Sequence, residues 1–176
     1  MNKKLKLWEL DRVSEEEFKG QKKFPLVVVL DNIRSLSNIG SVFRTSDAFN
    51  VEKIYLCGIT ATPPHREIQK TAIGATNSVE WEHVDSTAEI VKKLKAEGYA
   101  ICSIEQTEET VLLNEVSQLP ESKFALVMGN EVDGVDQDVV DLSDYVIEVP
   151  QFGTKHSLNV SVCTGVVLWE FTKKWI

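Results

Sequence analysis

The sequence predicts an α/β fold, a three-layer sandwich around a mostly parallel sheet, and three observations lead to this prediction. Short runs of apolar, β-branched residues alternate with segments of helical periodicity along the chain. Its 176 residues suit a single domain. No repeat, low-complexity stretch or linker divides them. We therefore expect one folded domain at residues 24–176, preceded by a helical arm at residues 1–23.

The first elements follow from capping residues and an apolar run. Residues 3–20 are expected to be helical, with Ser14 and Glu17 spaced as a capping box. Residues 25–30 form a continuously apolar run, as in a strand that is buried on both faces. Glycine and asparagine residues then open a helix at about 40–49.

The remaining elements repeat the same two patterns. Strands are expected where apolar, β-branched and aromatic residues cluster, over residues 53–57, 78–83, 99–104, 124–128 and 145–149. Helices are expected over 87–97 and 157–173, where apolar residues recur every three to four positions. Strands that alternate with helices in this way form a mostly parallel sheet with helices on its faces.

Charge is distributed unevenly along the chain. It carries 27 acidic and 19 basic residues, a net charge of −8. Residues 1–24 hold seven basic and five acidic residues, or +2, which leaves −10 for the rest. Proteins that coat nucleic acid are usually basic, because they neutralise phosphates. The N-terminal segment, with Lys155–His156 and Lys173–Lys174, is either an RNA-facing surface or a solvated amphipathic helix, and charge alone favours the solvated helix.

Several functional classes find no support in the sequence. The cysteines stand far apart without a CxxC pair, and the histidines have no triad or metal-ligand spacing. We expect no metal, and reduced cysteines in a cytoplasmic protein. No apolar run approaches the roughly 18 residues of a membrane span, and there is no GxGxxG or Walker A pattern. The residues concerned are Cys57, Cys102, Cys163, His65, His83 and His156.

Polar and glycine residues follow the first strand directly, over residues 31–40. In open α/β sheets such strand-to-helix turns bind ligands, and free amides at a helix N-terminus attract anions. Arg44 comes one helical turn after Gly40, so its guanidinium is expected to clamp a phosphate beside those amides. The alternative is a surface arginine paired with Asp47 or Asp31.

A second strand-to-turn segment follows residues 124–128. Gly129 permits close approach of the backbone to a ligand, and Gly134 suits a left-handed turn position. Glu131 lies between them and is either a functional carboxylate or a solvated turn residue. Taken alone, this pattern is common at strand ends.

The third segment begins where Pro150 stops a strand. A loop leads to Ser157 and Asn159 at the start of the last, largely apolar helix. Ser157 could serve only as an N-cap and Asn159 only as a polar residue of the first turn. A buried asparagine at that point would need a hydrogen-bonding partner.

Together the segments at 38–44, 129–134 and 150–160 resemble motifs 1, 2 and 3 of the SpoU (TrmH-like) RNA ribose methyltransferases of the SPOUT class. The resemblance extends over residues 24–173. It implies a deep trefoil knot at the C-terminal end, S-adenosylmethionine as cofactor, and a homodimer with active sites near the subunit interface. The implied reaction is direct methyl transfer to a ribose 2′-oxygen of RNA, without a metal.

The resemblance also implies roles for single residues. The family's motif 1 arginine, here Arg44, is held to activate the ribose 2′-hydroxyl. Arginine stays protonated and is a poor base, so we expect Arg44 to position the target phosphate and stabilise an alkoxide-like oxygen. The expected catalytic residues are Asn38, Arg44, Glu131, Ser157 and Asn159. The expected cofactor contacts are Glu105, Gly129, Val149, Ser157 and Leu158.

The expected substrate is tRNA, with a guanosine of the D-loop as the suggested target, because the arm is short and residues 97–107 look closest to the tRNA-methylating members. Three alternatives stay open: an rRNA 2′-O-methyltransferase, a non-catalytic RNA-binding dimer on the same fold, and an unrelated α/β enzyme acting on a phosphorylated metabolite. The last does not explain residues 157–160. At one position, Gln151, many family members have methionine, which leaves the pocket lining there open.

Overall fold

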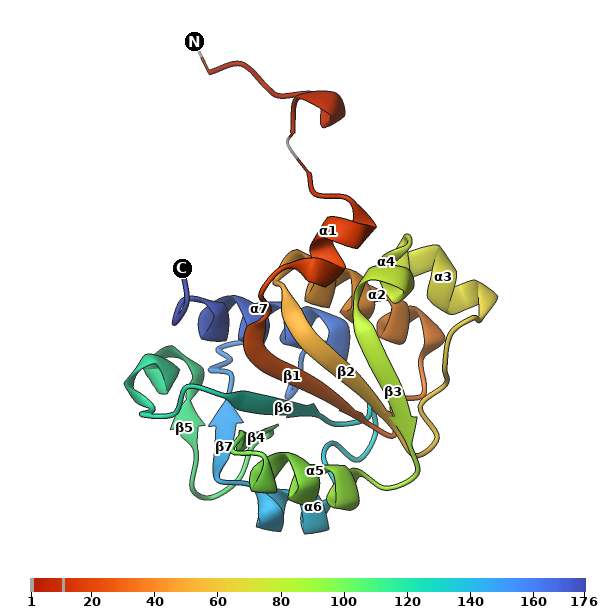
Figure 1. Cartoon of the computed structure of the whole chain (residues 1–176). Helices are drawn as coiled ribbons and strands as arrows, with labels where there is room; N and C mark the ends of the chain where they lie inside the picture. Colours follow the sequence, from red (N-terminus) through yellow and green to blue (C-terminus); the bar gives the residue numbers. More distant parts are fainter. Residues whose placement is uncertain (1, 11) are drawn as a thin grey trace.

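The computed structural model describes residues 2–10 and 12–176, and within them the strands form one seven-stranded sheet (Figure 1). The strand order is β3-β2-β1-β6-β4-β7-β5, and all the pairs are parallel. The strands are β1 Phe24–Asp31, β2 Val51–Cys57, β3 Glu80–Val84, β4 Ala100–Ile104, β5 Val111–Leu112, β6 Phe124–Met128 and β7 Tyr145–Glu148. The predicted parallel α/β sheet is confirmed.

Helices cover both faces of the sheet and make three layers (Figure 1). One face carries α5 (Thr87–Ala96) and α6 (Gln137–Leu142). The other carries α2 Leu36–Ala48, α3 Arg66–Ala72, α4 Ala75–Ser78, η2 Leu113–Gln118 and α7 Val160–Thr172. Side chains of β1 point alternately into the two cores, Val28 into one and Val27 into the other. That is why its whole run is apolar.

Strand order and chain order differ most at β6. The chain moves outward from β1 through β2 to β3, crosses to β4 on the other side, and later inserts β6 between β1 and β4. Ligands bind to open α/β sheets at such switch points, beyond the C-terminal ends of the strands. Because β1 and β6 are neighbours, the turns that follow them lie side by side.

The N-terminal arm differs from the continuous helix expected at 3–20. It contains a 3₁₀ turn, η1 (Leu7–Glu9), and a short helix, α1 (Glu15–Gly20), and the part of this prediction at residues 1 and 11 lies outside the described residues. The capping box is confirmed, since Glu17 N donates to Ser14 Oγ at 3.2 Å and Ser14 N to Glu17 Oε2 at 2.7 Å. The helix α1 gains tertiary packing through buried Phe18, and a short helix without such packing is marginal.

Other boundaries shift for local reasons. α2 begins at Leu36 rather than near residue 40, because Ser35 Oγ accepts a hydrogen bond from Asn38 N and caps the helix there. β3 begins at Glu80 rather than at residue 78, since α4 occupies 75–78. The short elements α3, α4, α6, β5 and η2 were not predicted, because they are shorter than the periodicity that would reveal them.

Candidate active site

A cavity of about 650 Å³ opens beyond the C-terminal ends of β4, β6 and β7. The loop after each of these strands contributes to its wall, and the first turn of α7 closes one side. Seven of the predicted site residues line it, namely Glu105, Gly129, Glu131, Val149, Ser157, Leu158 and Asn159. The second and third sequence segments therefore meet at one cavity, as the three-motif interpretation requires.

The loop after β6 is held in a tight turn by Asn130, whose function the sequence did not reveal. Its Oδ1 accepts hydrogen bonds from Val132 N at 2.9 Å and Asp133 N at 2.8 Å, and its Nδ2 donates to Gly134 O at 3.2 Å. Gly134 has a φ of +74°, as predicted for a left-handed turn residue. A Cβ on Gly129 would clash with the backbone of Gly134, so both glycines are required for this loop.

Glu131 joins this loop to the N-terminus of α2. Its Oε2 accepts from Arg34 N at 3.2 Å, and its Oε1 accepts from Ser35 N at 3.2 Å and from Asn38 Nδ2 at 2.9 Å. Two of the amides expected to be free for a phosphate, those of Arg34 and Ser35, are thus already bound by a carboxylate of the chain itself. The predicted anion site at this helix N-terminus is wrong in that respect, although its physical basis, the attraction of an anion to helix amides, holds.

The electrostatics of Glu131 follow from these contacts. Partial burial acts to raise the pKa of Glu131, but the hydrogen bonds from Asn38 and from backbone amides, including those of Arg34 and Ser35, outweigh burial and hold the pKa below its ordinary value. Glu131 is therefore ionised at neutral pH and acts as a hydrogen-bond acceptor. It is a poor candidate for a general base, because a lowered pKa weakens its affinity for a proton.

The lowered pKa of Glu131 predicts how the stability of the fold depends on pH. A carboxylate whose folded pKa lies below its unfolded value stabilises the fold above the unfolded pKa, and this contribution is lost as the pH falls through the folded pKa. We expect the free energy of unfolding of the wild type to exceed that of Glu131→Gln at neutral pH, with the gap narrowing as the pH falls below the ordinary value of 4.5. Urea unfolding across a pH series measures this. The exposed Glu108→Gln provides a matched control, and a gap that is independent of pH would contradict the account.

Asn38 links Glu131 to the third segment. While its Nδ2 donates to Glu131, its Oδ1 accepts from Asn159 Nδ2 at 3.2 Å. Asn159 is the N-cap of α7, and its Oδ1 accepts from Ser161 N at 2.9 Å and Val162 N at 3.4 Å. The last helix begins at Val160 rather than at residue 157, and Ser157 therefore does not have the N-cap role that was one of its two possible functions. A chain of side-chain amides thus connects α2, the β6 loop and α7, which are far apart in sequence.

Glu105, which follows β4, supports the cavity wall from the other side. Its Oε2 accepts from Val135 N at 3.1 Å, and its Oε1 accepts from Gln106 N at 2.8 Å. A Cβ on Gly134 would clash with this carboxylate. Glu105 is therefore both part of the lining and a brace for the β6 loop, which the sequence interpretation as a cofactor contact did not foresee.

Arg44 does not line the cavity of its own chain. It lies on the exposed side of α2, and among the described residues it forms no ion pair, so the expected alternatives of Asp47 and Asp31 are not its partners. The next residue, Thr45, packs against α7, where a Cβ on Gly165 would lie 3.7 Å from Thr45 Cγ2. Arg44 is thus an exposed side chain of α2 that can meet an external group.

A buried carboxylate at the end of β1 was also missed. Asp31 is 0% exposed and accepts from Thr87 Oγ1, Asn32 Nδ2 and Asp136 N. Its charge is the main reason why the pKa of Asp136 is raised. Through these bonds Asp31 joins β1 to α5 and to the loop that follows Glu131. An acidic residue directly after a fully apolar strand is the sequence signal that could have marked it.

Other classes of site find no support among residues 2–10 and 12–176. No group of three or more histidine, cysteine, aspartate or glutamate side chains could hold a metal ion. None of the helices is long and apolar enough to cross a membrane. Cys57 and Cys102 are buried free thiols, and Cys163 is partly buried beside the cavity, where burial raises the pKa of its thiol to about 11.

The motif order, the parallel sheet and the shared cavity define a family. The chain belongs to the SpoU rRNA Methylase family, whose model matches residues 25–169. It is 34% identical to a tRNA (guanosine(18)-2′-O)-methyltransferase of Aquifex aeolicus, over 92% of this chain and 74% of that protein. It is also 34% identical to the 23S rRNA (guanosine-2′-O-)-methyltransferase RlmB of Neisseria meningitidis, over 83% of this chain. The chain spans 57% of the length of that second relative.

Solved structures agree with the family assignment. The crystal structure of the A. aeolicus TrmH/SpoU tRNA modifying enzyme matches with a TM-score of 0.78 and 29% identity, over 91% of this chain and 79% of that one. An AdoMet-bound rRNA methyltransferase of Sinorhizobium meliloti matches with a TM-score of 0.80 at 24% identity, over 88% of this chain and 58% of that one. At 24% identity, the match to the Sinorhizobium meliloti structure is a likeness of fold.

Proposed function

We propose that this protein transfers a methyl group from S-adenosylmethionine to a ribose 2′-oxygen of RNA. The observation that carries the proposal is the hydrogen-bonded connection of Asn159, Asn38 and Glu131 at the edge of one cavity, because it joins the three motif segments. The two relatives at 34% identity support it, since both are named as guanosine 2′-O-methyltransferases.

The cavity suits S-adenosylmethionine. Its volume of about 650 Å³ falls within the usual range of small-molecule sites, roughly 300–1,000 Å³. An apolar wall suited to the adenine ring is formed by Ile104, Met128, Ile147, Val149 and Leu158. The lining also includes acidic side chains, among them Glu131 and Asp133, which complement a cationic ligand. Gly129 leaves the backbone open to close approach. When bound, the cofactor would supply an electrophilic methyl group.

The residues of the chain would align the reacting groups and stabilise the developing charge, and they would transfer few protons themselves. Glu131 and Asn38 fix the loop and helix that bound the cavity, and Ser157, which no described residue hydrogen-bonds, is free to orient substrate. Arg44 would bind the phosphate of the target nucleotide and stabilise negative charge as the 2′-oxygen loses its proton to a phosphate oxygen or to water. The 2′-oxygen then bonds to the methyl carbon as the bond from that carbon to sulfur breaks, and S-adenosylhomocysteine leaves. Catalysis is then mostly alignment of the reacting atoms, assisted by this positive charge.

We further propose that the protein is a homodimer paired through α7. This helix is apolar on all sides, since Val167 and Leu168 face the core while Val162, Val166 and Trp169 are exposed. A helix that is apolar all round is normally buried, and a second copy of the chain would cover the outer stripe. The helix α2, which carries Arg44, packs against α7 through Thr45.

Val166→Asp is expected to convert the dimer to a monomer, because it places a charge in the centre of the apolar stripe. Light scattering after size exclusion measures the mass. The exposed Ile59→Asp, in the loop that follows β2, is the control and should leave the mass unchanged. A monomeric wild type, or a dimeric Val166→Asp protein, would contradict the proposal.

The finer expectations belong to the same proposal. We favour tRNA over rRNA, with a D-loop guanosine as target, and relatives of both substrate types are named. We also propose a C-terminal trefoil knot, a division into an arm at 1–23 and a domain at 24–176, and a cytoplasmic location. The insertion of β6 between β1 and β4, with β7 beyond β4, supports the knot.

Isothermal titration of the purified protein with S-adenosylmethionine, and in parallel with S-adenosylhomocysteine, tests the proposal first. We expect binding of both ligands at one site per subunit. NAD serves as a control ligand of similar size that shares the adenosine group. Absence of binding in both titrations, with and without bulk tRNA and rRNA, would contradict the proposed function and favour an RNA-binding dimer or a metabolite enzyme.

A further inference from the structure

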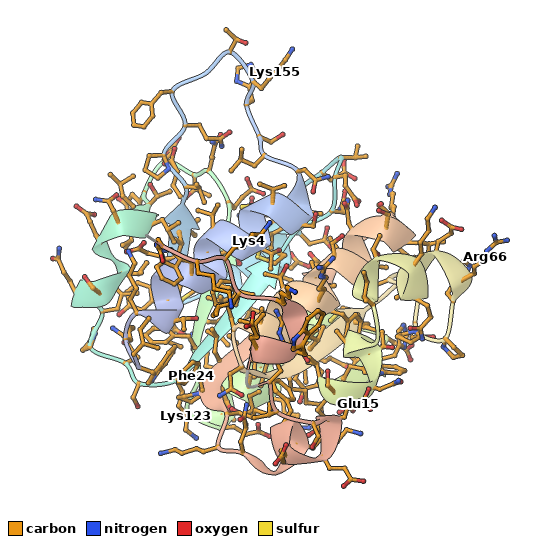
Figure 2. All side chains as sticks on the ribbon, turned by 90° about the horizontal axis from the view of Figure 1, so that it is seen from above. Lys4, Glu15, Phe24, Arg66, Lys123 and Lys155 are labelled. Atoms are coloured by element: carbon orange, nitrogen blue, oxygen red, sulfur yellow. The ribbon has the colours of Figure 1, made fainter. Side chains whose placement is uncertain are left out.

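The loop between β7 and α7 carries the most exposed large apolar side chain of those described, Phe152, which is 97% exposed. Its neighbours on the tip are Gly153, Thr154 and Lys155, all exposed. Figure 2 shows Lys155 at the end of a loop that projects away from the body. Among residues 2–10 and 12–176, no hydrogen bond involves residues 151–158. The tip is therefore held only by its two ends.

Both ends of this loop belong to the cavity. Gln151 lines it on the outgoing side, and His156 and Ser157 line it on the return, whereas Phe152 to Lys155 do not. The ring of Phe152 thus stands on the rim, one residue beyond the wall. A nucleotide whose ribose reached the cavity would have its own base, or the next base, at this rim.

The local charge suits an anionic ligand. The chain has 27 acidic residues in 176, yet none occurs between Glu148 and Glu170. Of the three acidic side chains that line the cavity, Glu105 and Glu131 accept hydrogen bonds from backbone amides, and Asp133 lies 3.8 Å from the guanidinium of Arg34. The β7–α7 loop, which forms this rim, has no acidic residue, and it carries the ammonium group of Lys155 and the imidazole of His156.

From these observations we propose that Phe152 is a stacking platform for an unpaired base of the RNA substrate, with Lys155 binding an adjacent phosphate. Single-stranded RNA is recognised in this manner, by bases stacked on aromatic rings beside cationic side chains. Phe152 is a positioning residue in this scheme, since it touches the base and not the reacting atoms. The inference rests on the proposed function, because it assumes an RNA substrate.

The test uses the 176-residue chain and four variants: Phe152→Ala, Phe152→Tyr, Lys155→Ala and, as an exposed apolar control that does not line the cavity, Ile59→Ala. Steady-state methylation of the RNA that the wild type methylates gives KM and kcat separately. We expect Phe152→Ala to raise the KM for RNA by about tenfold. Phe152→Tyr should stay within about twofold of wild type because it keeps the ring. Lys155→Ala should raise KM and weaken the dependence of KM on salt.

A second readout is independent of catalysis. A uridine-rich RNA oligonucleotide with one 2-aminopurine is titrated with each protein, and stacking on an aromatic ring quenches its fluorescence. We expect quenching with the wild type and Phe152→Tyr, and its loss with Phe152→Ala. The affinity for S-adenosylmethionine should be equal in all variants.

Three results would overturn the inference. The first is an unchanged KM and unchanged quenching in Phe152→Ala. The second is a weakened affinity of that variant for S-adenosylmethionine, which would make the loop a cover for the cofactor, and the third is a changed oligomeric mass, which would make the loop a subunit contact. Failure of the proposed function is distinguishable, because the wild type itself would then neither bind S-adenosylmethionine nor methylate RNA.

Discussion

Arg44→Ala is expected to lower kcat for ribose methylation by about 10²–10³-fold, the usual cost of removing one charged or hydrogen-bonding group that stabilises a transition state. The affinity for S-adenosylmethionine should not change, because Arg44 does not line the cavity. The fold should also be intact, since the side chain is exposed and makes no ion pair within the described chain. Single-turnover methylation and isothermal titration measure the two effects.

Two further variants make this prediction specific. Arg44→Lys keeps the charge but not the planar fork that binds a phosphate through two hydrogen bonds, so we expect partial activity. Arg66→Ala removes another exposed arginine, at the start of α3, and should leave kcat within about twofold. Equal losses for Arg44→Ala and Arg66→Ala would indicate a general effect of charge on RNA binding and would remove Arg44 from the reaction.

Asn38→Asp is expected to have the second largest effect, on both stability and activity. The change replaces a donor with a carboxylate that faces Glu131 Oε1 across the present 2.9 Å hydrogen bond. Two carboxylates at that distance repel, and one of them must take up a proton or move away. We expect a loss of about 2 kcal/mol in the free energy of unfolding at neutral pH, and a kcat lowered by at least tenfold because the junction of α2 and the β6 loop opens.

The pH dependence separates this mechanism from simple loss of a side chain. Protonation of either carboxyl restores a hydrogen bond, so the stability deficit of Asn38→Asp should shrink as the pH is lowered. Denaturant unfolding at several pH values measures the deficit. Asn77→Asp, an exposed position whose side chain makes no hydrogen bond within the described chain, adds the same charge as a control. A deficit that is the same at all pH values, or equal in the control, would contradict this account.

The sheet was predictable because its strands are locally distinct. The continuously apolar run of β1 indicates burial on both faces, and six of the seven strands overlap the segments predicted as strands. The two-residue strand β5 and the 3₁₀ helix η2 carry too few residues for a pattern. The arm was over-predicted as a helix, because a capping box identifies where a helix starts and not whether anything packs against it.

The candidate site was predictable as a set of residues but not as a set of contacts. Nothing local to Asn38 indicates that it bonds both Glu131 and Asn159, since these lie 93 and 121 residues further along the chain. The same is true of the amides at the N-terminus of α2, which look free in the sequence and are bound to Glu131 in the fold. Asp31 was missed because two of its partners, Thr87 and Asp136, lie 56 and 105 residues further along the chain. The partners of Asn130 lie within four residues of it, in the turn after β6.

The central claim is that the methyl group goes to a ribose oxygen of RNA. The most direct measurement supplies the protein with S-adenosylmethionine carrying an isotopically labelled methyl group and with unmodified tRNA and rRNA, then digests the RNA to nucleosides and identifies the labelled species by mass spectrometry. The account predicts label in a 2′-O-methylated nucleoside, from the tRNA pool, that disappears with Arg44→Ala. Label on a base, or no label in either RNA from a protein that binds the cofactor, would contradict it.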